Sequence, residues 1–423
     1  MFVEEFIPHF SYIIAAHLHS KIFKYEKLCR RINGIASICL SGTAHISQPY
    51  VNVQLILMAI FATFKNALAV DAKKRKAVAW WLITGVIMII IQTLLGGVTR
   101  LTGSGLSITK WNPIFGILPP LNARQWNEAF DGYKQIGQFK YMNSGFSLED
   151  FKHIFFWEWF HRFWARLLGI VFVIGFVYFL VKKYFDKQMI RPFVILFILG
   201  GLQGLIGWIM VASGLDDAHL YVDHIRLAAH FVSAMVLACY TLWFALQLLI
   251  PQERRVADSR LFSFTLIIVA VLFIQLTWGA FMAGLKAAMA APTWPDINGD
   301  FMPENVLANS WVNHKIAVHF IHRGLAYLLC ALFISWVIAA WQRTKAHKGS
   351  WLRMTMWVSP VLVLLQVMLG VVTVLSAPKI ILGKFGPFET LAELHQLVAM
   401  FLLMSLVVNL YITGARRTGV KAI

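Results

Sequence analysis

Charged residues are scarce in this 423-residue chain: they make up 14% of it, whereas soluble domains contain roughly a quarter. A soluble protein of this length would have too few charges to cover its surface. With 59% apolar residues and a mean hydropathy of +0.67, the composition excludes a soluble multi-domain enzyme and a disordered chain. The composition favours an integral, multi-pass membrane protein.

Cysteine is also rare. Cys29 and Cys39 lie near the start of the chain, and Cys239 and Cys330 lie inside long apolar runs. No CxxC or CxxCH motif is present, which argues against covalently attached c-type haem and against a thiolate zinc site. The loops between the apolar runs contain no cysteine, so they offer no loop disulfide.

Eight apolar runs are long enough to cross a bilayer as helices of about 20 residues. They are too long for barrel strands and do not alternate with a period of two. We therefore predict an all-α polytopic membrane protein. The predicted spans are Val78–Leu101, Ile154–Val181, Pro192–Val211, Leu227–Ile250, Leu261–Leu285, Lys315–Trp341, Met354–Ser376 and Leu391–Tyr411.

Residues 1–77 are predicted to form an amino-terminal extension. The stretch is polar and basic, and its one marginal apolar run, Tyr50–Phe64, is expected to be interfacial or disordered. It lacks a clear signal-peptide core followed by a cleavage site. It is either a lineage-specific extension or the product of an upstream-extended translation start, in which case Met58 is the candidate native start.

The net charge of +18 comes from 38 Lys and Arg against 20 Asp and Glu. The places of these residues along the chain explain the positive surplus. Most of the surplus lies before the first span and in the loops after the second, fourth, sixth and eighth spans. The positive-inside rule then places both ends of the span region in the cytoplasm. We expect a bacterial inner-membrane protein, or a mitochondrial inner-membrane protein if the chain is eukaryotic, in contact with lipid and not with nucleic acid.

Two outward loops are long. The loop from Thr102 to His153 is too rich in aromatic and proline residues for a flexible linker, and loops of this length are usually functional. Its residues of this kind include Trp111, Pro113, Pro119, Pro120, Trp126 and Tyr133. The loop between the fifth and sixth spans contains Pro292, Trp294, Pro295 and Pro303 and is predicted to face the same way.

Ionisable residues inside spans are functional candidates, because each costs about 2.5–3.5 kcal/mol at mid-membrane depth. Every even-numbered span carries a histidine near its outward end, and the odd-numbered spans carry none. These histidines are His161, His230, His322 and His395.

The histidines belong to an internal repeat. Each odd-numbered span carries a Gln-x-x-x-Gly motif. From the first histidine of a half to its second motif, and from that motif to its second histidine, the spacings differ by only about two residues between the halves. The motifs begin at Gln92, Gln203, Gln275 and Gln366. We therefore predict two tandem, pseudo-symmetric four-helix bundles, residues 78–250 and 251–423, with the pairs His161/His230 and His322/His395.

Two imidazoles facing each other across a four-helix bundle suit haem held axially on both faces. Zinc usually takes three or four ligands, and copper would bring sulfur ligands. Small residues would let the macrocycle approach the backbone, and Arg162 and Arg323 could neutralise its propionates. The glycines concerned are Gly96, Gly97, Gly207, Gly279 and Gly370. The alternative is that these are buried histidines that stabilise helix contacts, and four repeat-related positions make it the weaker interpretation.

The repeat differs at one informative position. Glu158 precedes His161 by one helical turn, whereas His319 precedes His322, so only the first bundle has a carboxylate beside its histidine pair. A carboxylate there can act as an acid or base or stabilise a developing cation. An ion pair between Glu158 and Arg162 at i,i+4 is the simpler alternative and is compatible with catalysis. The asymmetry predicts chemistry in the first bundle and a permanent haem in the second.

Residues 78–412 resemble the haem A synthase family, membrane enzymes that convert haem O to haem A for terminal oxidases. The motifs that carry the resemblance are Gly96–Pro120, Phe155–Gly169, Pro292–Pro303, His319–Tyr327 and Glu393–Gln396. The long first loop without a cysteine pair resembles the mitochondrial and proteobacterial subgroup.

The resemblance implies that haem O binds between His161 and His230, that Glu158 is needed for turnover, and that a haem b cofactor lies between His322 and His395. It implies an oxidoreductase that oxidises the C8 methyl group to a formyl group by successive hydroxylations. The implied partners are haem O synthase and terminal oxidase assembly factors, and a homo-oligomer stays open. The rival functions are a non-enzymatic b-type dihaem electron carrier and a haem transporter or chaperone. The carrier leaves the single Glu158 and the long aromatic loop unexplained, and a transporter or chaperone would need no second permanent haem.

Overall fold

The computed structural model describes residues 49–110, 116–346, 350–380 and 385–414, with side chains from residue 72 onward except at residues 252 and 346. Eight of its helices are long and apolar enough to cross a membrane, and the described residues contain one isolated β-bridge, between Ile297 and Asp300. The predicted all-α polytopic fold is confirmed. The predictions for residues 1–48 and for Cys29, Cys39, Trp111 and Pro113 lie outside the described residues.

The eight long helices follow the predicted spans. They are α2 (Pro49–Leu101), α5 (Leu148–Val181), α6 (Lys187–Ala212), α7 (His224–Leu249), α8 (Ser259–Gly284), α9 (Lys315–Ala346), α11 (Val358–Ser376) and α12 (Pro387–Thr413). The short elements are α3 (Ala123–Tyr133), α4 (Gly137–Met142), α10 (Leu352–Thr355), η1 (Gln252–Arg254), η2 (Ala287–Ala290) and η3 (Ala377–Lys379).

Local sequence explains where several helices begin. Ser147 and Asp150 form a capping box that starts α5 ahead of the predicted Ile154. Aspartates cap three other helices by accepting hydrogen bonds from backbone N–H groups of the first turn. They are Asp186 before α6, Asp223 before α7 and Asp258 before α8.

The amino-terminal part of α2 settles one of the two expectations for this stretch. Residues Tyr50–Phe64 are helical, as part of α2, and not disordered, and their interfacial position stays a prediction. The chain divides into two compact units at Val70, and the second unit, Asp71–Ile423, contains all eight predicted spans.

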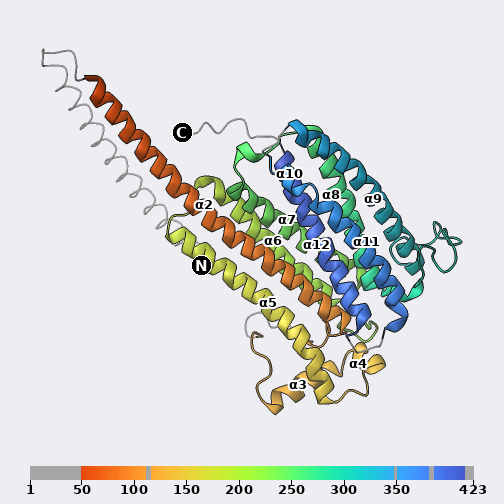
Figure 1. Cartoon of the computed structure of the whole chain (residues 1–423). Coiled ribbons are helices and arrows are strands. Elements are labelled where there is room, and N and C mark those ends of the chain that lie inside the picture. Colours follow the sequence, from red (N-terminus) through yellow and green to blue (C-terminus); the bar gives the residue numbers. More distant parts are fainter. Residues whose placement is uncertain (1–48, 111–115, 347–349, 381–384, 415–423) are drawn as a thin grey trace. The chain divides into compact units, whose positions relative to one another are not determined.

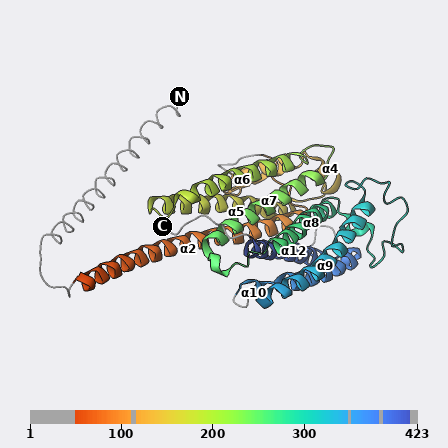
Figure 2. The same ribbon diagram turned by 90° about the horizontal axis from the view of Figure 1, so that it is seen from above.

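Within the second unit the long helices lie side by side (Figures 1 and 2). In the most apolar stretch of α12, 67% of the residues are buried, and in that of α7 50%, whereas the value is 6% for both α5 and α6. The main apolar core joins α7 and α2 to α8, α9 and α12. The two sequence halves therefore share their central packing, and the division into two bundles stays a prediction about the repeat.

The long loop after α2 is folded. Phe130 and Tyr133 of α3 pack on Phe151 and Phe155 of α5 in a small apolar cluster of their own. Figure 1 shows α3 and α4 at the end of the bundle where α2 finishes and α5 begins. We call this the loop end; α6, α8 and α11 also finish there, and α7, α9 and α12 begin there.

Candidate functional site

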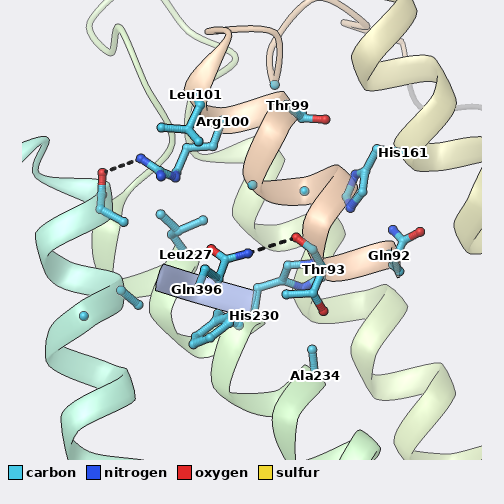
Figure 3. A pocket seen from close by; sticks show the side chains of 18 of the residues that line it. Gln92, Thr93, Thr99, Arg100, Leu101, His161, Leu227, His230, Ala234 and Gln396 are labelled. Carbon is cyan, nitrogen blue, oxygen red and sulfur yellow. Dashed lines mark hydrogen bonds between the residues drawn. The ribbon is translucent and has the colours of Figure 1, made fainter. Parts of the chain in front are cut away.

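A cavity of about 1520 Å³ lies among the spanning helices and is lined by residues of both sequence halves. All four predicted histidine ligands line it. Figure 3 shows the part around His161 and His230, with Arg100 on the loop side of both rings. The structure thus brings the two predicted histidine pairs to one continuous space.

Each of the four histidines faces a glycine on the neighbouring helix. A Cβ atom added to any of these glycines would crowd the imidazole ring. The pairs, with the distance from that Cβ to the nearest ring atom, are His161 with Gly96 (3.2 Å), His230 with Gly207 (2.7 Å), His322 with Gly279 (3.2 Å) and His395 with Gly370 (3.0 Å). The glycines are those of the Gln-x-x-x-Gly motifs, so the repeat specifies four equivalent places for an imidazole ring.

The second histidine pair is arranged as two facing rings. The ring centroids of His322 and His395 are 6.5 Å apart, with an angle of 73° between the planes. Nδ1 of each ring is buried and has no hydrogen-bond partner in the described part of the chain. Gln366 Nε2 lies 3.1 Å from Nε2 of His395 and fixes that side of the ring. Each ring therefore has one nitrogen available for a ligand.

The first pair has an equivalent glutamine with firmer support. Gln203 Nε2 lies 3.2 Å from His230 Nδ1 and donates to the His230 carbonyl oxygen at 3.1 Å. The Ser233 hydroxyl donates to Gln203 Oε1 at 2.6 Å. In the second half Gln366 Oε1 is buried without a partner among the described residues. The side chain that orients His230 is thus itself held in place.

Glu158 is buried and fully engaged, with 2% of its surface exposed. Its Oε2 accepts hydrogen bonds from the Ser107 hydroxyl at 2.7 Å and the Ile108 backbone N–H at 2.8 Å. Its Oε1 accepts from Arg162 Nη2 at 2.5 Å, so the ion pair expected at i,i+4 is present. These donors fix the carboxylate one helical turn from His161.

The second half uses the same positions differently. His319, which replaces Glu158, donates from Nε2 to the Ala287 carbonyl oxygen at 2.7 Å and accepts at Nδ1 from Arg323 Nη2 at 3.3 Å. Arg323 also donates to the carbonyl oxygens of Ala291 and Asp296. The helix–loop connection is thus kept, and no carboxylate stands at this position.

The two arginines predicted to neutralise propionates are both bound to loop backbone. Arg162 Nη2 donates to the Ile108 carbonyl oxygen at 3.1 Å in addition to Glu158, and Arg323 binds its two loop carbonyls. Both side chains line the cavity. Their observed contacts anchor the loops, and a role toward propionates stays a prediction.

Two cations that the sequence reasoning passed over also line the cavity. Arg100 at the end of α2 donates from Nη1 to the Ala283 carbonyl oxygen at 3.2 Å. Lys286, just after α8, places Nζ 3.5 Å from the centroid of the Tyr221 ring. Burial, and then the positive charges of Arg100 and Lys315, lower the pKa of Lys286 to about 8. This crowding of positive charge marks a place where an anionic group would be stabilised.

Glu393 is a second buried carboxylate, on α12. Both of its oxygens are buried with no hydrogen-bond partner in the described residues. The carboxylate lies against Gly97 of α2, where a Cβ atom would overlap it. Nearby, Gln396 Nε2 donates to the Thr93 carbonyl oxygen at 3.2 Å, which joins α12 to α2 (Figure 3). The sequence places Glu393 in a span but gives no indication of this contact between the halves.

No group of three or more His, Cys, Asp or Glu side chains in the described ranges is arranged to hold a metal ion. The histidines are therefore candidate ligands as pairs only. That arrangement is typical of bis-imidazole haem sites and unlike zinc sites.

Comparison with known proteins gives consistent matches. A family model described as cytochrome oxidase assembly protein matches residues 79–407. Haem A synthase of Parvibaculum lavamentivorans is 39% identical over 325 residues, which are 75% of this chain and 91% of that protein. Haem A synthase of Flavobacterium johnsoniae is 36% identical over 350 residues, covering 80% and 98%. That of Bradyrhizobium diazoefficiens is 36% identical over 345 residues, covering 80% and 92%.

Proposed function

The chain belongs to the haem A synthase family of cytochrome oxidase assembly proteins, and we propose that it binds haem O between His161 and His230 and oxidises its C8 methyl group to a formyl group. It is an oxidoreductase of the membrane that converts haem O to haem A. We further propose that a haem b cofactor is held between His322 and His395.

One observation carries the assignment of roles. Two repeat-equivalent histidine pairs line one cavity, and only the first has a carboxylate, Glu158, one turn from its ligand. A protein that only carried electrons would need two similar haem sites and no such carboxylate. This difference favours chemistry at the first pair and a resident cofactor at the second.

The second pair fits a haem iron. A metal–imidazole bond is about 2 Å long, so a centroid separation of 6.5 Å leaves room for one metal atom between the rings of His322 and His395. The buried, unpartnered Nδ1 atoms supply the two ligand positions, and Gly279 and Gly370 keep the space beside the rings open. Bound haem b would supply one-electron redox chemistry next to the substrate.

Glu158 is the residue that we propose to act in the reaction. Its three donors hold the carboxylate in one position beside His161. There it would stabilise positive charge that develops at the oxidised methyl group, or exchange a proton with the attacking water. His161 and His230 would orient the substrate, with Gln203 and Ser233 keeping the His230 ring in place.

The test compares Glu158→Gln with His319→Gln, the same helix position in the second half. The protein is expressed with haem O synthase, and the extracted haems are separated and quantified. We expect Glu158→Gln to retain bound haem O and haem b while haem A falls at least ten-fold. The control should still form haem A. Full haem A production by Glu158→Gln at unchanged haem content would show that the proposed role is wrong.

The alternatives are a b-type dihaem electron carrier and a haem transporter or chaperone. Expression with and without haem O synthase separates them from the enzyme. Haem A that appears only with the synthase supports the enzyme, and haem b alone under both conditions would exclude it.

We also propose the location and partners. The protein would lie in the bacterial inner membrane, or the mitochondrial inner membrane of a eukaryote, with both ends of the span region in the cytoplasm or matrix, as the distribution of basic loops indicates. Haem O synthase and terminal oxidase assembly factors are the expected partners, and self-association is open. Labelling of single cysteines placed in α3 and in the loop after α9 would test the orientation.

A further inference from the structure

The cavity reaches further from the loop end in the first half than in the second. When the halves are aligned on their Gln-x-x-x-Gly motifs and histidines, the cavity lining on each of the four helices extends further in the first half. On α2 it reaches Trp81, whereas on α8 it stops at Leu272, the counterpart of Ile89. The extension is about four to eight residues on the different helices, or roughly 6–12 Å at about 1.5 Å per residue.

Glycines line this side of the cavity in the first half. Gly200, Gly201 and Gly204 of α6 and Gly169 of α5 line the cavity, and a Cβ atom on any of them would meet nothing within 4 Å. Their counterparts in the second half all carry side chains: Val363, Leu364, Val367 and Cys330. Of these, Val363 and Val367 also line the cavity, and Leu364 is 65% exposed. Gly85 of α2 corresponds to the fully buried Ile268. The cavity is therefore narrower in the second half at Val363 and Val367, and it does not reach Ile268.

Aromatic rings close the extension at its far end. Trp81 stacks on Phe172, with ring centroids 5.3 Å apart and nearly parallel planes, and also packs on Phe193. Trp81 Nε1 donates to the Val171 carbonyl oxygen at 3.4 Å. Gly175 permits this position, because a Cβ atom there would overlap the Trp81 ring. We call the space lined by Trp81, Gly85, Gly169, Phe172, Gly201 and Gly204 the deep groove.

We propose that the deep groove holds the hydroxyethylfarnesyl chain of haem O. This inference rests on the proposed binding of haem O at His161 and His230. Haem O carries this long apolar chain and haem b does not, and an apolar groove continuous with the histidine pair would take the chain out of water. The shorter cavity lining of the second half would accept a haem without the chain. The groove thus makes the first half selective for the substrate and the second for the cofactor.

The test fills the groove with the residues that the second half already uses. Gly201→Leu/Gly204→Val copies Leu364 and Val367 into α6, and Gly201→Ala is a milder variant that adds one methyl group. The matched control is Gly324→Leu in α9, a glycine whose Cβ would also meet nothing within 4 Å but which does not line the cavity. The full-length proteins are purified from cells that make haem O, and haem O, haem A and haem b are quantified per protein.

We expect the double variant to contain at least ten-fold less haem O plus haem A per protein, with haem b unchanged. Gly201→Ala should contain several-fold less haem O plus haem A. Gly324→Leu should match the wild type. Wild-type haem O content in both groove variants would overturn the proposal. So would loss of a co-purifying phospholipid at unchanged haem O, because the groove would then hold a lipid chain.

His161→Ala, analysed in parallel, separates the two proposals. If His161→Ala loses haem O and the groove variants keep it, only the groove assignment fails. If His161→Ala keeps wild-type haem O, the binding of haem O at this pair is wrong. Should the double variant fail to retain haem b, and thus its fold, Gly201→Ala alone decides.

Discussion

Replacing Gly207 by alanine tests whether the glycines of the repeated motifs set the positions of the histidines. A Cβ atom on Gly207 would lie 2.7 Å from Cε1 of His230, whereas ordinary contact begins at 3.4 Å. The imidazole would have to retreat by about 0.7 Å. The same change at Gly370, where the distance from the added Cβ to Cε1 of His395 is 3.0 Å, requires the ring to move by about 0.4 Å.

Overpacking of this kind costs about 1–3 kcal/mol, which corresponds to about 5- to 150-fold in binding. Displacing the imidazole by a large part of an ångström also misplaces the bound substrate, and a misplacement of 1 Å can lower a reaction rate about 100-fold. We expect Gly207→Ala to reduce bound haem O and haem A at least ten-fold and to leave haem b unchanged. Gly370→Ala should reduce haem b by a smaller factor and leave bound haem O in place.

The assay is haem extraction and quantification from purified protein, with thermal unfolding in detergent as a check on the fold. Gly324→Ala adds a methyl group where nothing lies within 4 Å and serves as the control. The reasoning is refuted if Gly207→Ala and Gly370→Ala both keep wild-type haem contents. It is also refuted if each variant lowers both haems equally, since that would indicate a general loss of packing.

Three further results are expected. Ser107→Ala removes a hydrogen bond of 2.7 Å to the Glu158 carboxylate, and because bonds to charged groups contribute about 1.5–3 kcal/mol, haem A formation should slow about ten-fold at unchanged haem content. The pKa of Lys286 is lowered to about 8, so as the pH rises the folded protein loses this proton before the unfolded chain does. The thermal stability of the wild type relative to that of Lys286→Met should therefore rise between pH 8 and about pH 10, and a fall would contradict the lowered pKa. Thr265→Val leaves the buried Trp336 indole N–H, now 2.8 Å from the Thr265 hydroxyl, without an acceptor, which should destabilise the protein by about 1–3 kcal/mol, while Thr265→Ser should retain wild-type stability.

The features that the sequence predicted correctly depend on residues close together along the chain. The length of an apolar run determines whether a helix can span a bilayer, so all eight spans were identified without any tertiary information. The pairing of Glu158 with Arg162 follows from an i,i+4 spacing on one helix. The capping box at Ser147 is also local, but hydropathy, which sets the bounds of the predicted span, does not reveal it.

The features that were missed depend on contacts between distant segments. Ser107 and Ile108 reach Glu158 from a loop about 50 residues earlier in the chain, and no spacing rule predicts that approach. The sequence also does not indicate that Arg323 donates to carbonyl oxygens of the loop after α8, and its role toward a propionate stays a prediction. The contact of Glu393 with Gly97 depends on how α12 packs on α2, which the sequence does not reveal.

The two halves keep the same four histidine–glycine contacts, so the difference in their chemistry must come from the positions that changed. A single exchange would not make the second half catalytic. In a His319→Glu variant the new carboxylate would face the Ala287 carbonyl oxygen, an acceptor opposite an acceptor, without the hydroxyl and N–H donors that Ser107 and Ile108 provide to Glu158. Val363 and Val367 would also keep the cavity narrower than it is at Gly200 and Gly204 of the first half. Under the proposed assignment, catalysis in the first half would require the carboxylate, its loop donors and the open groove together, and Ala287 in the second half offers an acceptor where the first half has donors.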